Sequence, residues 1–168
     1  SYGHIASGYN LANDGLSVTY YIKDNATFSN GDSITSSDVL FSYSTLISEV
    51  AHPQYRIYWA DIKSVKILDE KSIKFIFKRK NPELHMIIGD IPIFSRKWLE
   101  GKEFDQTILE KPIASGPYII DSFEPGRYIT YKRNQNYWAI EEPTRVGMYN
   151  FDYIKFKYYK DCLLYTSD

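Results

Sequence analysis

The segment 112–138 constrains the fold most, because it places a tight turn between two alternating runs. The runs are Pro117–Phe123 and Tyr128–Arg133, and the turn is Glu124-Pro125-Gly126-Arg127. Proline pre-sets the backbone at the first central turn position, and glycine accepts the positive φ at the second, as a type II turn requires. The segment therefore predicts an antiparallel β-hairpin that ends in a chain corner at Asn134–Trp138.

Other parts of the chain also favour strands. Leu16–Lys23 alternates and is rich in β-branched and aromatic residues. Ile62–Leu68 and Ser72–Phe77 alternate on either side of the short connection Asp69–Lys71, so we expect a second hairpin. A last strand is expected over Asn150–Lys160. It would place three side chains on one face: Ile154, Phe156 and Tyr158.

One longer helix is expected after the first strand. Thr35 and Asp38 have the spacing of a capping box, with aspartate in the place of glutamate. The helix is expected to end near Glu49–Ala51, before His52-Pro53. Its apolar face would comprise five residues at helical spacing: Val39, Tyr43, Leu46, Ile47 and Val50.

The remaining segments are shorter. Asn81-Pro82-Glu83 favours the start of a helix that ends near Gly89, and Arg96–Glu100 favours a brief helical piece. Ile91–Phe94 is expected to be extended, Tyr55–Ala60 to be helix or coil, and Lys102–Lys111 to be a polar loop. Because helices and strands do not alternate strictly, a mixed α/β (α+β) fold is favoured over a doubly wound parallel sheet.

The composition narrows the class of partner. Aromatic residues make up 17% of the chain, with 16 Tyr. Tyrosine favours strands and also suits binding surfaces, so either explanation stays open. The net charge is −1 and there is no long basic run, which argues against nucleic acid as a partner. No apolar stretch approaches the roughly 20 residues that span a bilayer, and no signal sequence is visible.

The sequence contains no constellation that indicates catalysis. His4, His52 and His85 are scattered and lack metal-ligand spacing. Common phosphate-binding, hydrolase and metalloprotease motifs are absent from the sequence. The single cysteine, Cys162, cannot form an internal disulfide. We therefore expect no enzyme, no cofactor and no metal site.

Four passages, in order along the chain, resemble the family 5 extracellular solute-binding proteins, the peptide and nickel binding group of ABC importers. They are Leu16–Asp38, Val39–Leu46, Pro112–Tyr118, which resembles a Gly-Thr-Gly-Pro-Tyr loop, and Ile129–Trp138, which resembles an Arg-Asn-Pro-x-Tyr-Trp type corner. Two further segments resemble the branch that takes up murein peptides and peptide antibiotics: Asn81–Gly89 and Arg96–Trp98.

The resemblance implies a fold like that of the type II periplasmic binding proteins, with this chain as an internal fragment of the first lobe. Residues 1–111 would form the accessory subdomain of that lobe, and residues 112–161 would return into the lobe. Cys162–Asp168 departs from the family pattern and is expected to be a non-native tail. The second lobe would be missing.

The resemblance also implies where a ligand would bind. By position, the ligand cleft would receive Tyr55, Arg56, Tyr58, Ile93 and Phe94. Aromatic rings and a guanidinium suit a peptide backbone or carboxylate, but the tyrosines could instead pack in the core. The family motif residues are expected to be structural. They are Asn30, Gly31, Asp38, Ser115, Gly116, Pro117, Tyr118, Arg133, Asn134, Tyr137 and Trp138.

The function implied is that of the substrate-binding component of an ABC transporter. Such a protein binds oligopeptides in the periplasm, or on a lipid anchor outside the cell, and delivers them to an inner-membrane permease. Its lobes would close reversibly on the peptide, with no bond made or broken. A nickel chelate, haem or an oligosaccharide on the same scaffold stays open. A Tyr-rich extracellular interaction module is the alternative outside the family.

Overall fold

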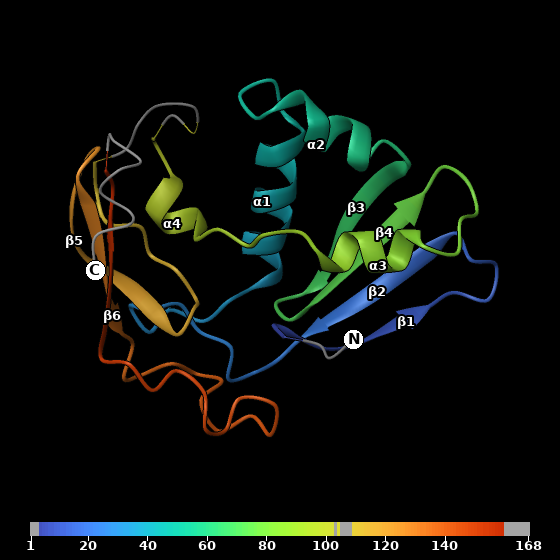
Figure 1. Ribbon diagram of the computed structural model, residues 1–168. Coiled ribbons are helices and arrows are strands. Elements are labelled where there is room, and N and C mark those ends of the chain that lie inside the picture. The colour runs from blue at the N-terminus through green and yellow to red at the C-terminus, as the bar shows by residue number, and fades with distance from the viewer. Residues whose placement is uncertain (1–3, 103, 105–108, 160–168) are drawn as a thin grey trace.

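The computed structural model describes residues 4–102, 104 and 109–159. In these residues, helices pack on a four-stranded antiparallel sheet, and a three-stranded antiparallel sheet lies at the other end of the molecule (Figure 1). The mixed α/β class is therefore confirmed. Part of the expected polar loop, Lys160 of the expected last strand and the tail Cys162–Asp168 lie outside the described residues.

The larger sheet has the strand order β1-β2-β4-β3. Its strands are β1 (Ala6–Leu11), β2 (Ser17–Ile22), β3 (Ile62–Asp69) and β4 (Ser72–Phe77). The expected β3–β4 hairpin is confirmed, and β2 pairs with β4 across a gap of some fifty residues in the sequence, with Val18 opposite Phe75. The edge strand β1 was not foreseen, because its small and polar residues carry little strand signal.

Four helices are described: α1 (Ser36–Ile47), α2 (Pro53–Tyr58), α3 (Leu84–Gly89) and α4 (Arg96–Leu99). Helix α3 begins at Leu84, later than the expected start at Asn81-Pro82-Glu83. The Asn81 side chain accepts a hydrogen bond from the Glu83 N–H at 2.9 Å, which forms a turn before the helix. The expected short helices are thus present, and Tyr55–Ala60 is mostly helical.

The end of α1 differs from the expectation. The Ser48 backbone is extended, with ψ of 172°, and the Ser48 hydroxyl donates to the Thr45 carbonyl oxygen at 2.6 Å. The helix therefore ends at Ile47. Val50 lies beyond it and is 48% exposed, so its assignment to the buried apolar face was wrong.

The core lies between α1 and the larger sheet. Val18 and Phe75 of the central strands and Leu46 of α1 are at most 1% exposed. The Tyr43 ring meets the Phe75 ring edge-on, with centroids 5.9 Å apart. Burial of each large apolar side chain contributes roughly 1.5–3 kcal/mol, so this contact holds α1 against the sheet.

The smaller sheet has the order β5-β6-β7, with β5 (Tyr118–Glu124), β6 (Tyr128–Arg133) and β7 (Tyr153–Lys157). Gly126 has φ of 74°, and the Arg127 N–H donates to the Glu124 carbonyl oxygen at 3.0 Å, so the expected type II turn is confirmed. Strand β7 is shorter than expected.

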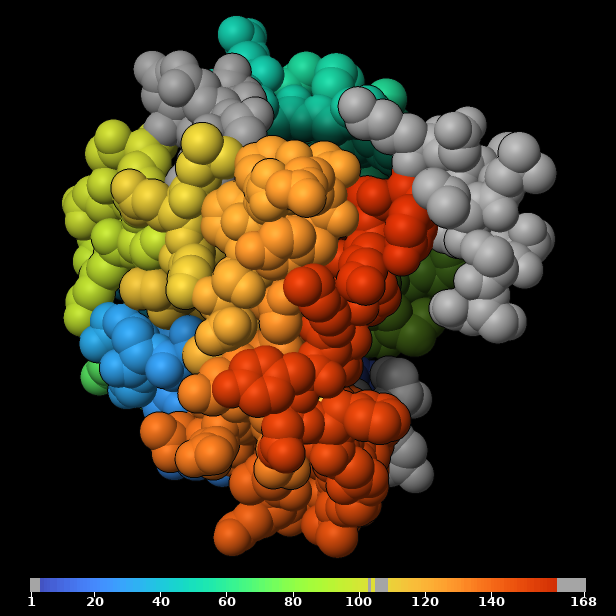
Figure 2. Space-filling model, turned by 60° about the vertical axis from the view of Figure 1, so that its left-hand side comes forward, coloured from blue at the N-terminus to red at the C-terminus, as the bar shows by residue number. Residues whose placement is uncertain are grey.

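The smaller sheet occupies one face of the molecule, beside the segment near residue 30 (Figure 2). The two are joined by a hydrogen bond of 2.7 Å from the Ser29 N–H to the Ala114 carbonyl oxygen. The division of the chain after residue 111 stays a prediction.

Candidate functional site

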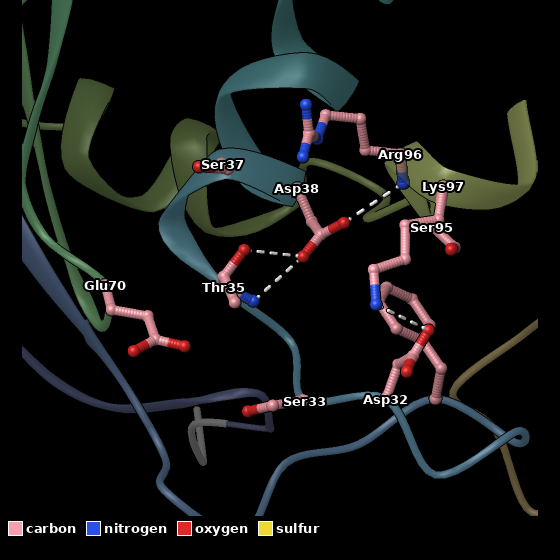
Figure 3. Close-up of a pocket in the computed structure, with 10 residues that line it drawn as sticks. Asp32, Ser33, Thr35, Ser37, Asp38, Glu70, Ser95, Arg96 and Lys97 are labelled. Atoms are coloured by element: carbon pink, nitrogen blue, oxygen red, sulfur yellow. Dashed lines mark hydrogen bonds and ion pairs between the residues drawn. The ribbon is translucent and has the colours of Figure 1, made fainter. Parts of the chain in front are cut away.

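The Asp38 carboxylate joins the first turn of α1 to the start of α4 (Figure 3). One oxygen accepts hydrogen bonds from the Thr35 N–H at 3.0 Å and from the Thr35 hydroxyl at 2.7 Å. The other accepts from the Arg96 N–H at 3.0 Å. Asp38 is 8% exposed, so water competes little for these bonds. The expected capping role of Asp38 is confirmed, and its bond to α4 is an addition.

Ser42 fixes the segment before α4 one turn further along α1. Its buried hydroxyl accepts from the Phe94 N–H and donates to the Asp38 carbonyl oxygen, both at 2.7 Å. Ile93 and Phe94 are half-buried and pack against the core. The expected extended segment therefore runs along α1 without pairing in a sheet.

Helix α2 carries the other residues that sequence placed at the ligand. The Tyr55 ring stacks on Trp59 at 5.5 Å and 12°, and the Tyr58 ring meets Trp59 at 5.7 Å and 63°. Trp59 is 3% exposed, whereas Tyr55 and Tyr58 are 37% and 47% exposed. The tryptophan is thus the core residue, and each tyrosine covers it while presenting a free surface.

Arg56 joins α2 to the end of α1. Its Nη1 donates to the Ser48 carbonyl oxygen at 2.6 Å. A guanidinium has five N–H donors in a fixed fork, so further donors remain for another acceptor.

A groove lies between the outer side of α1 and the end of α4, with a volume of about 710 Å³. We refer to it as the α1–α4 groove. Its lining includes Phe41, Ser44, Thr45, Ser48, Leu99 and Phe104. The groove adjoins the predicted ligand residues of α2, because Arg56 donates to the carbonyl oxygen of the lining residue Ser48. It also adjoins the predicted ligand residues before α4, because the centroid of the Phe94 ring lies 5.5 Å from that of the lining residue Phe104.

Sequence reasoning missed this groove. Its wall on α1 has a visible signal, because residues 41, 44, 45 and 48 recur at helical spacing as a second stripe beside the apolar face. The opposite wall lies more than fifty residues further along the chain, and no local pattern connects the two.

A second hollow, of about 370 Å³, lies at the start of α1 (Figure 3). The Lys97 ammonium lies 3.3 Å from the Asp32 carboxylate within it, and the Asn30 amide donates to the same carboxylate at 3.0 Å. The Asn30 hydrogen bond and then Lys97 lower the pKa of Asp32. Gly31 has φ of 87°, so Asn30 and Gly31 shape a turn.

The corner Asn134–Trp138 closes on the loop before β5. The Asn134 N–H donates to the Pro117 carbonyl oxygen at 2.8 Å, and its side-chain oxygen accepts from the Asn136 N–H at 3.1 Å. The Trp138 indole N–H donates to the Ser115 carbonyl oxygen at 3.2 Å. The motif residues of the corner, Asn134 and Trp138, thus hydrogen-bond to the motif residues of the loop, Pro117 and Ser115.

The remaining motif residues fix the ends of the smaller sheet. Tyr118 donates its hydroxyl hydrogen to the Phe151 carbonyl oxygen at 3.0 Å, and Arg133 forms an ion pair with Asp152 at 2.6 Å. Tyr137 is 2% exposed. Gly116 offers its carbonyl oxygen to the Asn134 amide at 3.4 Å.

Within residues 4–102, 104 and 109–159, no group of three or more His, Cys, Asp or Glu side chains could hold a metal ion. None of the helices described is both long and apolar enough to span a membrane.

Residues 2–162 match the family model of the bacterial extracellular solute-binding proteins, family 5. The chain belongs to this family. Family 5 comprises bacterial extracellular solute-binding proteins.

Two relatives from Agrobacterium fabrum illustrate the similarity. The "Probable peptide-binding protein YejA" of Agrobacterium fabrum is 31% identical over 169 aligned positions, which cover 96% of this chain and 27% of that protein. The "Peptidoglycan-binding protein YepA" of the same organism is 28% identical, covering 94% and 26%. The chain thus spans about a quarter of the length of these relatives.

Solved structures confirm the fold of family 5. CtaP, an ABC transporter substrate-binding protein of Listeria monocytogenes, superposes with a TM-score of 0.80 at 22% identity, covering 96% of this chain and 33% of CtaP. NikZ from Campylobacter jejuni, solved with Ni(L-His), gives 0.76 at 21% identity, covering 96% and 31%. The predicted type II binding-protein fold is therefore correct.

Proposed function

We propose that the complete gene product is the substrate-binding component of an ABC importer that binds oligopeptides outside the cytoplasmic membrane and delivers them to a membrane permease. The observation that carries this proposal is the family 5 match over residues 2–162. The peptide-binding name of a relative at 31% identity supports peptide as the ligand. The second lobe of the same protein would close over the peptide.

In this proposal, Tyr55, Arg56, Tyr58, Ile93 and Phe94 contact the peptide. The exposed faces of Tyr55 and Tyr58 would pack along peptide backbone and side chains, and the remaining Arg56 donors would bind a carboxylate or carbonyl oxygen. Ile93 and Phe94 would contribute through a backbone that Ser42 holds in place.

A second candidate is a nickel chelate, because NikZ was solved with Ni(L-His). A panel of candidate ligands separates the peptide proposal from the nickel-chelate proposal. Thermal melting of the complete gene product would be followed with a mixture of di- to pentapeptides, with a muropeptide, and with nickel plus histidine. We expect stabilisation by the peptides or the muropeptide, since a ligand of the folded state raises the melting temperature. Stabilisation by nickel–histidine alone would refute the peptide proposal.

A further inference from the structure

We propose that the α1–α4 groove is a subsite for an apolar side chain of the bound peptide. This inference rests on the proposed function and deepens it, since it assigns a side-chain preference to the receptor. The groove volume of about 710 Å³ falls within the range of roughly 300–1,000 Å³ that is usual for ligand sites.

The walls of the groove are held in place before any ligand binds. Two partly buried hydrogen bonds tie the chain leading into α4 to α1, from Phe94 N–H to the Ser42 hydroxyl and from Arg96 N–H to the Asp38 carboxylate. Leu99, at the end of α4, is 6% exposed and anchors that wall. A groove that is formed in advance loses little entropy when a side chain enters.

The described lining favours an apolar group over an anionic one. Phe41, Leu99 and Phe104 supply apolar surface from both walls. Among the residues that the structure describes, the charged members of the lining are the acid Glu100 and the base Lys102. Lys102 is also engaged, because its ammonium lies 4.3 Å from the centre of the Trp98 ring and pairs with Glu110. An anionic ligand side chain would therefore lose hydration without finding a free cation among the described lining residues.

The position of the groove suits a peptide that α2 also contacts. Ser48 lines the groove and its carbonyl oxygen accepts from Arg56, so the guanidinium lies at the groove's end. A peptide whose backbone or carboxylate binds Arg56 could direct a neighbouring side chain between Phe41 and Leu99. The groove and α2 would then form one continuous surface.

The test compares peptide preferences of the complete gene product by titration calorimetry. The probes are tri-alanine and the three tripeptides in which one alanine is replaced by phenylalanine. We expect at least one phenylalanine peptide to bind about tenfold or more tightly than tri-alanine, the ratio that burial of an aromatic ring supplies.

Ser44→Trp fills the groove from the exposed side of α1. We expect it to remove the preference, so that the phenylalanine peptides bind Ser44→Trp no more than about twofold more tightly than tri-alanine does. Glu49→Trp is the matched control, because Glu49 is also exposed but lies beyond α1 and outside the groove lining. It should keep the full preference.

Phe41→Ala is a second variant, which removes part of a groove wall and leaves the space open. Its control is Leu40→Ala, because the Leu40 side chain packs toward the core and not into the groove. Phe41→Ala should lower the ratio by which the phenylalanine peptide binds more tightly than tri-alanine, whereas Leu40→Ala should keep that ratio. A preference that survives in both Ser44→Trp and Phe41→Ala overturns the subsite while peptide binding stands. Failure of every peptide to bind the wild-type protein would overturn the proposed function itself, and this inference with it.

Discussion

Replacement of Asp38 by alanine tests how much of the fold depends on one buried carboxylate. The variant loses the hydrogen bonds from the Thr35 N–H, the Thr35 hydroxyl and the Arg96 N–H. A hydrogen bond to a charged group contributes about 1.5–3 kcal/mol, and an N-cap about 1 kcal/mol. Thr35 is half-buried, so water replaces part of the loss there. We therefore expect a loss of about 3 kcal/mol, below the simple sum.

The assay is urea denaturation of the complete gene product, followed by far-UV circular dichroism. With a slope of about 1–3 kcal/mol/M, a loss of this size lowers the transition midpoint of the affected lobe by roughly 1–3 M. Asp38→Asn keeps one acceptor oxygen and should lose about half as much. Ser37→Ala, on the same turn, is the control. A midpoint for Asp38→Ala that equals the Ser37→Ala midpoint would refute the argument that this carboxylate holds α1 to α4.

Two further predictions concern the turn and the N-terminal segment. Gly126→Ala forces alanine to φ of 74° and should cost about 1–2 kcal/mol, measured by thermal melting, whereas Gly8→Ala has open space around its Cβ and should be near neutral. Burial, then Arg145 and Lys23, lower the pKa of His4 below 6.5. The unfolded chain then binds this proton at higher pH than the folded chain, so stability should fall as pH drops below about 6.5. His4→Gln should flatten this part of the pH profile, and an equal slope in both proteins would contradict the assignment.

Local signals accounted for much of the architecture. The Pro125-Gly126 turn and the Thr35–Asp38 cap each lie within four residues, so their chemistry can be read directly. The β3–β4 hairpin followed from alternation around Asp69–Lys71. These elements depend on neighbouring residues, and tertiary contacts did not override them.

The features that the sequence did not reveal depend on distant contacts. Strand β1 forms because β2 offers it an edge, and its own residues are small or polar. The α1–α4 groove needs Phe41 and Leu99 on facing walls, and the bond from Arg96 to Asp38 that joins the two helices spans 58 residues. The roles of Tyr55 and Arg56 in binding stay predictions, because their contacts within the chain leave both able to bind a ligand.

The most direct test of the central claim is a calorimetric titration of the complete gene product with defined peptides. We predict saturable binding of about one peptide per chain, weakened at least tenfold by Arg56→Ala, since a charge-assisted bond contributes about 1.5 kcal/mol or more. Saturation by nickel–histidine with no heat from any peptide would contradict the account.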